Sequence, residues 1–468
     1  MNRKPRNIRE LREGGYRLLS VKEEMRKNLI DRIKRGQELF PGIIGYEDSV
    51  IPQVENAILA GQDIIFLGER GQAKTRIIRS LVGLLDDEIP VIAGCEINDN
   101  PFQPICKSCR DRVAKHGDKV EISWLPRESR YGEKLATPDT TIADLIGEVD
   151  PIRVAEGRYL SDELTIHYGL IPRTNRGIFS INELPDLVER IQVGLFNLME
   201  EKDIQIRGYK IRLPLDVYIV ASANPEDYTN RGRIITPLKD RYGSQIRTHY
   251  PRQLEQEIEI MEQERTVFED SAYRVFVPQY MKEIVAELTV LARRHSDINQ
   301  RSGVSVRMSI SNYENLVSNA LRRAIRLGEE VAVPRISDLP FLVASTSGKI
   351  ELETIEEEME GQLVERLTQN TVLNTFNRYF TIQDFEEFLE RFNSSQGVEV
   401  SEAKASEEYV DITKGIGGLD EGIRKLDCDH GPAATASAVE FILEGLHLNK
   451  RLNKEKLARG SQYRGGND

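Results

Sequence analysis

The sequence predicts an α/β protein: a parallel five-stranded sheet flanked by helices, then an α-helical lid domain and a small helical C-terminal unit. Between Phe40 and Pro251, short β-branched runs alternate with helical patterns, which is typical of a parallel sheet covered by helices. After Pro251, apolar residues recur every three or four positions, which indicates helices. The expected strands are Asp63–Leu67, Ile89–Ile92, Gly177–Ile181, Val217–Ala221 and Gln245–His249.

Changes in composition predict the domain boundaries. Residues 1–36 hold twelve basic against five acidic residues and are expected to form a basic helical arm, which either binds a partner or leads into the core. The other expected segments are an α/β core (37–250), a helical lid (251–392), a polar linker (393–408) and a small helical unit with a polar tail (409–468). The core is expected to carry a cysteine-rich insertion (94–134), an inserted segment (146–172) and a hairpin over Asp203–Leu213 that turns at Arg207–Tyr209.

Composition narrows the class of protein. The chain has 468 residues and a formal charge of −12, which makes duplex nucleic acid an unexpected partner because phosphate neutralisation dominates such binding. No apolar run approaches the ~20 residues that span a bilayer, and the amino terminus has no secretory pattern. Four cysteines are too few for a disulfide scaffold. We therefore expect a cytoplasmic protein outside the membrane.

The strongest motif is a phosphate loop. A predicted buried strand ends at Gly68, and Lys74 and Thr75 open a helix, which is the context of the pattern G-x-x-x-x-G-K-[ST]. Backbone N–H groups of such a loop bind phosphates, the lysine reaches the β/γ-phosphates, and the Thr75 hydroxyl binds Mg²⁺. Ala73 replaces the second glycine and fits only if its φ is negative. The alternative is a turn that only caps a helix. The predicted nucleotide-binding residues are Gly68, Glu69, Arg70, Gly71, Gln72, Ala73, Lys74 and Thr75.

Polar residues end two further strands. Asn182 and Glu183 follow Gly177–Ile181, where P-loop ATPases place a residue that orients the water shell of Mg²⁺ and a carboxylate that polarises the attacking water. Asn182 is neutral, so we expect weaker Mg²⁺ binding. Asn224 ends the next apolar strand and is expected to contact the γ-phosphate or the water. The alternative for Glu183 is one exposed acid after a buried strand.

Two arginines complete the pattern. Arg241, in PLKDRY, could neutralise charge on a neighbouring subunit's nucleotide, and Arg307, in GVSVR, could reach the nucleotide from the lid. A lone arginine is usually a surface residue, so these two matter because of their order after the phosphate loop.

The order of these motifs resembles AAA+ ATPases, and more narrowly their MoxR and magnesium-chelatase I-subunit branch. The segment 146–195 is similar to an insertion of that branch, and the resemblance covers about residues 37–350. It implies that Lys74 and Thr75 form Walker A, that Asn182 and Glu183 end Walker B, and that Ala73 is a tolerated variant. It also implies that Asn224 is sensor 1, Arg241 the arginine finger and Arg307 sensor 2.

The same resemblance implies a homo-hexameric ring that hydrolyses ATP with Mg²⁺ and remodels or matures a protein partner. Its partner would be a separate von Willebrand factor A-type protein, since no such domain is visible in the chain. Three alternatives stay open: an activator that acts through the alternative sigma factor, a nucleotide-dependent scaffold with weak hydrolysis, and direct tetrapyrrole metallation. The activator is disfavoured because the sequence has no GAFTGA loop.

Three cysteines cluster in the insertion at 94–134. Cys95, Cys106, Cys109 and His116 have the spacing C-x10-C-x2-C-x6-H, in a loop with little apolar content. Such a loop needs a staple, and four soft ligands are typical of a structural Zn²⁺ site. The alternatives are unrelated buried thiols and a redox pair.

Overall fold

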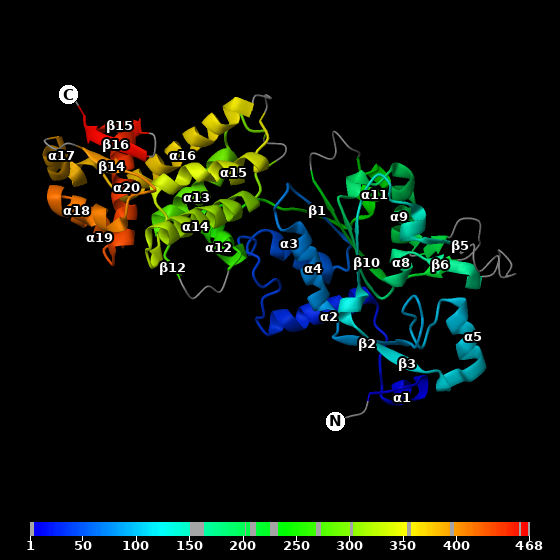
Figure 1. Cartoon of the computed structure of the whole chain (residues 1–468). Coiled ribbons are helices and arrows are strands. Elements are labelled where there is room, and N and C mark those ends of the chain that lie inside the picture. Colours follow the sequence, from blue (N-terminus) through cyan, green and yellow to red (C-terminus); the bar gives the residue numbers. More distant parts are fainter. Residues whose placement is uncertain are drawn as a thin grey trace. The chain divides into compact units, whose positions relative to one another are not determined.

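The structure is a computed structural model that describes residues 4–149, 163–201, 203–205, 212–224, 233–267, 273–299, 303–352, 357–393, 397–457 and 460–466. The chain forms two compact units, Met1–His249 and Tyr250–Asp468, and each is described by itself (Figure 1). Among the described residues, no helix combines the length and the apolar character that crossing a membrane requires.

The first unit is built on a parallel five-stranded sheet. Its strands are β1 (Ile64–Leu67), β4 (Tyr131–Leu135), β7 (Gly177–Asn182), β10 (Val217–Ala223) and β11 (Ser244–Arg247), in the order β11-β1-β10-β7-β4. Every neighbouring pair in this sheet runs parallel. The carboxyl ends of β1, β10 and β7 therefore meet at one edge, which positions the site.

Helices cover both faces of this sheet. Ile64 and Phe66 pack into one core with α2 (Val21–Lys34), α3 (Val50–Leu59) and α4 (Lys74–Ser80). Ile65 points to the opposite face and joins the core that includes α9 (Glu189–Glu201). This alternation follows from the two-residue period of a strand, and it confirms the predicted fold class.

One predicted strand was assigned to the wrong sheet. Ile89–Ile92 lies in β2 (Glu88–Ile92), which pairs antiparallel with β3 (Ile122–Pro126) outside the main sheet. The fifth strand of the main sheet is β4, inside the segment expected to be an insertion. As an edge strand with largely half-buried side chains, β4 lacks the apolar run that reveals the inner strands.

Of the two interpretations of the basic segment, the structure agrees with the lead-in to the core, because residues 4–36 are folded into the first unit. Helix α1 (Ile8–Glu13) buries Ile8 and Leu11, and α2 buries Met25 and Leu29. Arg9, Arg12, Arg26, Lys27 and Lys34 of these helices are exposed, as expected for the polar face of an amphipathic helix.

Two predicted segments are only partly described. β8 (Asp203–Gln205) pairs antiparallel with β9 (Arg212–Pro214), as the predicted hairpin requires, but its turn lies outside the described residues. In the segment 146–172, β5 (Gly147–Val149) pairs antiparallel with β6 (Ile166–Tyr168), and residues 150–162 lie outside the description.

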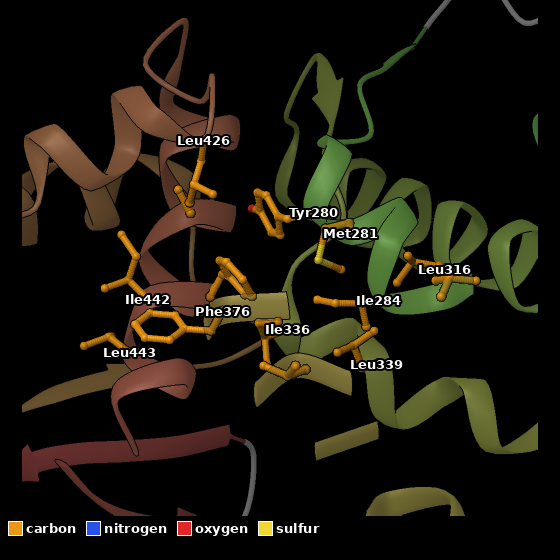
Figure 2. Close-up of a cluster of buried hydrophobic side chains, with 14 of the residues drawn as sticks. Tyr280, Met281, Ile284, Leu316, Ile336, Leu339, Phe376, Leu426, Ile442 and Leu443 are labelled. Atoms are coloured by element: carbon orange, nitrogen blue, oxygen red, sulfur yellow. The ribbon is translucent and has the colours of Figure 1, made fainter. Parts of the chain in front are cut away.

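The second unit is mainly helical and has one extended core (Figure 2). Its long helices are α12 (Leu254–Glu264), α13 (Gln279–Ala292), α14 (Arg307–Leu327), α16 (Glu357–Tyr379) and α20 (Pro432–Leu448). Tyr280 of α13 stacks on Phe441 of α20, with ring centroids 4.4 Å apart. A Cβ on Gly445 would lie 2.0 Å from Phe376, so glycine allows α20 to approach α16 closely.

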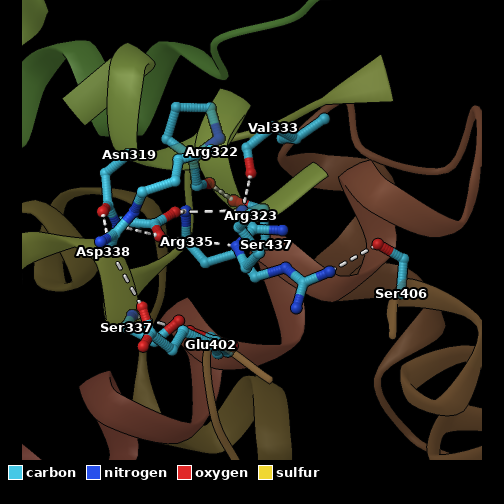
Figure 3. Close-up of polar contacts among 12 residues, drawn as sticks. Asn319, Arg322, Arg323, Val333, Arg335, Ser337, Asp338, Glu402, Ser406 and Ser437 are labelled. Carbon is cyan, nitrogen blue, oxygen red and sulfur yellow. Dashed lines mark hydrogen bonds and ion pairs between the residues drawn. The ribbon is translucent and has the colours of Figure 1, made fainter. Parts of the chain in front are cut away.

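Residues of the predicted linker and of the predicted C-terminal unit pack into the core of the second unit, so neither is a separate segment. The expected linker contains β14 (Val398–Val400), whose two valines are buried. Arg335 Nη2 donates to Ser406 Oγ at 2.5 Å, near the buried Arg323–Asp338 ion pair (Figure 3). The expected polar tail forms β15 (Leu452–Leu457) and β16 (Gly460–Gly465), which pair with each other, and β16 also pairs with β14. The described parts of the predicted lid, linker and C-terminal unit therefore contribute to one extended core.

Candidate functional site

The phosphate loop joins β1 to α4, as predicted. Lys74 is the first residue of α4 and is buried. Its Nζ donates to the carbonyl oxygens of Gly68 and Glu69, at 2.5 and 2.8 Å, and to Asn224 Oδ1 at 2.6 Å. Gly68 is required sterically, because a Cβ there would lie 1.9 Å from Thr248 Oγ1. The lysine ammonium is thus fixed at the carboxyl edge of the sheet.

Gln72 stabilises the inside of the loop. Its side-chain oxygen accepts hydrogen bonds from Glu69 N at 3.1 Å and from Thr248 Oγ1 at 2.7 Å. Its carbonyl oxygen accepts one from Tyr46, whose pKa is raised to about 12 by burial. The buried glutamine therefore ties the loop to β11's end. Arg70 is exposed, Thr75 is half-buried, and Gly71 has the positive φ of 75° that favours glycine.

Ala73 does not have the negative φ that was expected for an alanine at this position. Its backbone is left-handed, with φ of 54° and ψ of 13°. A left-handed conformation costs a non-glycine residue about 1–2 kcal/mol. Ala73 still immediately precedes the first turn of α4, so the loop keeps its geometry at the expense of strain.

Asn224 and Glu183 lie together at the ends of β10 and β7. Asn224 Nδ2 donates to Glu183 Oε2 at 2.7 Å, while its Oδ1 accepts from Lys74. Glu183 also has a left-handed backbone, with φ of 55°. The structure therefore brings three predicted residues into one hydrogen-bonded chain, Lys74–Asn224–Glu183.

Asn182 has a partner that the sequence did not reveal. Its Nδ2 donates to Glu133 Oε1 at 2.6 Å, and its Oδ1 accepts from Ser222 Oγ at 3.2 Å. Because β4 was not predicted as a strand, Glu133 could not be placed beside Asn182 from the sequence. The pairing of β4 with β7 brings the Glu133 carboxylate beside the end of β7. The neutral Asn182 thus lies against a negative charge from the neighbouring strand.

The charge of Glu133 is stabilised. Partial burial opposes ionisation, but hydrogen bonds from Arg79, Tyr131 and Asn182 outweigh it and lower the pKa of Glu133. Arg79 Nε donates to Glu133 Oε2 at 2.9 Å. Glu133 is consequently an anion at neutral pH.

Arg241 is the last residue of α11 (Thr236–Arg241). Its Nη2 donates to Glu200 Oε2 at 2.9 Å, and its guanidinium lies 4.7 Å from the centre of the Phe196 ring. Both partners belong to α9. Arg307 is the exposed first residue of α14, in the second unit.

The cysteine prediction is partly corrected. Cys95, Cys106 and Cys109 come together with Asp99, and one ligand atom from each lies within 4.8 Å of the others. His116 is the exposed last residue of α5 (Lys107–His116) and is not a member of this group. Asp99 was missed because its polar loop gave no sign that it would be buried.

The fold and the site define the chain as an AAA+ protein. A parallel sheet presents a phosphate loop after β1, an Asn-Glu pair at the end of β7 and an asparagine after β10, all at one edge.

Sequence relatives place it within that class. The chain is 28% identical over 258 residues to magnesium-chelatase subunit ChlI-2 of Arabidopsis thaliana, covering 52% of this chain and 56% of that protein. It is 24% identical to ChlI of Mesostigma viride, covering 60% and 76% of the two chains. It is 27% identical to the magnesium-chelatase 38 kDa subunit of Cereibacter sphaeroides, covering 47% and 62%. The chain thus spans less than two thirds of two of these relatives. These relatives are all magnesium-chelatase subunits, which supports the predicted resemblance to the MoxR and magnesium-chelatase I-subunit branch of AAA+ ATPases.

Other comparisons add little. No family model matches the chain. Solved structures that overlap with it include a magnesium-chelatase BchI–BchD complex (19% identity, 69% of this chain and 98% of that one, TM-score 0.37) and an ATPase from Cytophaga hutchinsonii (15% identity, 76% and 97%, TM-score 0.32).

Proposed function

We propose that the chain is an ATP-hydrolysing motor. The observation that carries the proposal is the hydrogen-bonded chain Lys74–Asn224–Glu183 at the end of a phosphate-loop strand. Lys74 would bind the β/γ-phosphates, and Glu183 would accept a proton from the attacking water. Asn224 contacts both side chains, so it would hold the carboxylate at a fixed position relative to the phosphates.

The oxygen donors near the loop fit Mg²⁺. The Thr75 hydroxyl, the Asn182 amide oxygen and a carboxylate are the hard ligands that Mg²⁺ takes, usually with retained waters. Bound Mg²⁺ neutralises phosphate charge. Glu133 would supply the negative charge that Asn182 lacks, because the two side chains are hydrogen-bonded.

Steady-state hydrolysis by the purified full chain tests the activity. Lys74→Ala is expected to abolish ATP binding and turnover, because it removes the only cation in this hydrogen-bonded chain. Lys27→Ala, an exposed lysine on α2, is the matched control and is expected to keep full activity. Equal turnover in wild type and Lys74→Ala would contradict the proposal.

We also propose a homo-hexameric ring in which Arg241 acts on the nucleotide of the neighbouring subunit. The position of Arg241 after the phosphate loop in the motif order supports this role, and its side chain is 29% exposed although it contacts α9. Arg307 would act on the nucleotide from the lid. A complementation experiment tests the ring: Arg241→Ala and Lys74→Ala are each expected to be inactive alone. Mixed, they form interfaces that combine an intact phosphate loop with an intact Arg241. Recovered activity supports the proposal, and a mixture without activity opposes it.

The work of the motor is proposed to be the remodelling or maturation of a protein partner, together with a separate von Willebrand factor A-type protein. Glu183→Gln with ATP should retain such partners, whereas Lys74→Ala should not. Capture of a sigma factor instead would favour the activator alternative. Turnover far below enzymatic rates in the presence of captured partner would favour the scaffold alternative.

A further inference from the structure

A compact group of soft and acidic ligands lies outside the nucleotide site. Sγ of Cys95, Cys106 and Cys109 and a carboxylate oxygen of Asp99 all lie within 4.8 Å of one another. Asp99, Cys106 and Cys109 are buried, and Cys95 is half-buried. The four residues come from one segment between the end of β2 and the first turn of α5. Cys95, Asp99 and Cys106 thus come together in a segment outside the regular elements, and Cys109 joins them from the first turn of α5.

Local backbone geometry produces this convergence. Asn98 has a left-handed backbone, with φ of 55°, and directs Asp99 back towards Cys95, whose Sγ accepts from Asp99 N at 3.3 Å. Cys106 caps α5, and its Sγ accepts from Cys109 N at 3.4 Å. Backbone N–H groups directed at sulfur stabilise thiolates.

Asp99 supplies an observation that does not depend on the cysteines. Its side chain is 0% exposed. Oδ2 accepts from Cys106 N at 3.0 Å, whereas Oδ1 is buried and has no hydrogen-bond partner. An unsatisfied buried polar atom costs about 1–3 kcal/mol, and a charged one costs more. A cation bound among the three sulfurs would satisfy this oxygen.

We propose that Cys95, Asp99, Cys106 and Cys109 bind one structural Zn²⁺. Thiolates select soft metals, and Zn²⁺ accepts three sulfurs and one carboxylate in a tetrahedron. With Zn–S bonds of ~2.3 Å, tetrahedral ligands lie about 3.8 Å apart. The group therefore needs to contract by about 1 Å at most. All four ligands come from the protein, which is typical of a closed structural site.

The site would stabilise the start of β7. Asn98 Nδ2 donates to Arg173 O at 2.7 Å, and Asn175 Nδ2 donates to Ile97 O at 3.0 Å. Residues 173–175 lead directly into β7, which ends in Asn182. A metal that fixes residues 95–109 thus supports the strand below the nucleotide site, and this inference holds whether or not the chain hydrolyses ATP.

Metal analysis of the full-length protein, purified without chelators under reducing conditions, tests the proposal. The wild type is expected to contain about one zinc per chain, and the Co²⁺-substituted form should show the charge-transfer absorption of thiolate ligands. Less than a tenth of an equivalent of zinc, both as purified and after incubation with Zn²⁺, would overturn the proposal. So would iron in place of zinc.

Variants identify the ligands. Cys106→Ser is expected to lose the zinc, and Asp99→Asn to release it to a chelator at least ~10-fold faster. His116→Ala and Cys428→Ser are the matched controls and should keep wild-type zinc, because His116 is exposed outside the group and Cys428 lies in the second unit. Circular dichroism checks that each variant is folded. Zinc lost from His116→Ala but retained in Asp99→Asn would overturn the ligand set.

Discussion

Lys74 Nζ donates a hydrogen bond of 2.6 Å to Asn224 Oδ1, so the end of β10 holds the cation of the phosphate loop. The same asparagine donates to Glu183, which makes Asn224 the link between the phosphate-binding and water-activating groups. We therefore predict that Asn224→Ala lowers kcat about 10²-fold while it changes nucleotide affinity little, because Lys74 keeps its two carbonyl partners. Separate measurement of kcat and of nucleotide Kd checks this. A large loss of affinity with kcat unchanged would assign Asn224 to binding alone.

Asn224→Asp should change the pH dependence of turnover. A second carboxylate beside Glu183 Oε2 raises the pKa of one member of the pair, since like charges disfavour ionisation. A general base works when it is deprotonated. The rise of kcat with pH is thus expected to move to higher pH, and a kcat–pH profile identical to that of the wild type would contradict this prediction.

The contact between Asn182 and Glu133 predicts that the carboxylate can be moved from position 133 to position 182. Glu133→Gln should raise the Mg²⁺ concentration that gives half-maximal turnover by about tenfold, because it removes the stabilised anion beside Asn182. The double variant Asn182→Asp with Glu133→Gln returns one carboxylate and one amide to the same two positions. It should regain most of the lost Mg²⁺ affinity. If the double variant binds Mg²⁺ no better than Glu133→Gln, the two residues do not share this function.

The left-handed backbone of Ala73 predicts a stabilising substitution. Ala73→Gly removes a steric cost of about 1 kcal/mol and should raise the unfolding temperature of the first unit by roughly 2–4 °C in thermal melts. Ala114→Gly, at an exposed position within α5, is the matched control. It should lower the stability by a similar amount, because glycine is unfavourable inside a helix. Equal effects of the two substitutions would show that Ala73 is not strained.

A buried ion pair ties α2 to the turn that directly precedes β4. Arg130 Nη1 and Nη2 donate to the two carboxylate oxygens of Glu24 at 2.7 and 2.6 Å, and Arg130 is 1% exposed. Glu24→Gln leaves this guanidinium without its counter-charge and should lower the free energy of unfolding by about 3–5 kcal/mol in urea melts. Glu13→Gln, an exposed acid on α1, should change it little. A loss below about 1 kcal/mol for Glu24→Gln would indicate that the pair contributes nothing net.

The strands β1, β7 and β10 could be predicted because each is an apolar run that polar residues follow. β11 was also predicted, although Ile246 is its one buried residue. β4 carries Gly132 and Glu133, and pairs only with β7. β4 has no run of buried apolar side chains, so a pattern-based prediction passes over it. Glu133 was missed for the same reason.

The tertiary contacts of the termini were also beyond local patterns. The charge of residues 1–36 left open whether they bind a partner or lead into the core, because the partner of Glu24 is Arg130, more than a hundred residues away. The polar stretch 393–408 has the composition of a linker, but its Val398 and Val400 are buried in the core of the second unit. The candidate metal ligands were limited in the same way. Sequence spacing indicated His116, whereas the fold brings Asp99 beside the three cysteines.

The most direct test of the central proposal is single-turnover ATP hydrolysis by wild type and Glu183→Gln, with nucleotide binding measured on the same samples. Glu183→Gln is expected to bind ATP like the wild type and to hydrolyse it at least ~10²-fold more slowly, because it lacks the carboxylate that accepts a proton from water. Glu189→Gln, an exposed acid in the first turn of α9, should behave as wild type. Unchanged hydrolysis in Glu183→Gln, or a wild type that binds no ATP, would contradict the assignment of this site.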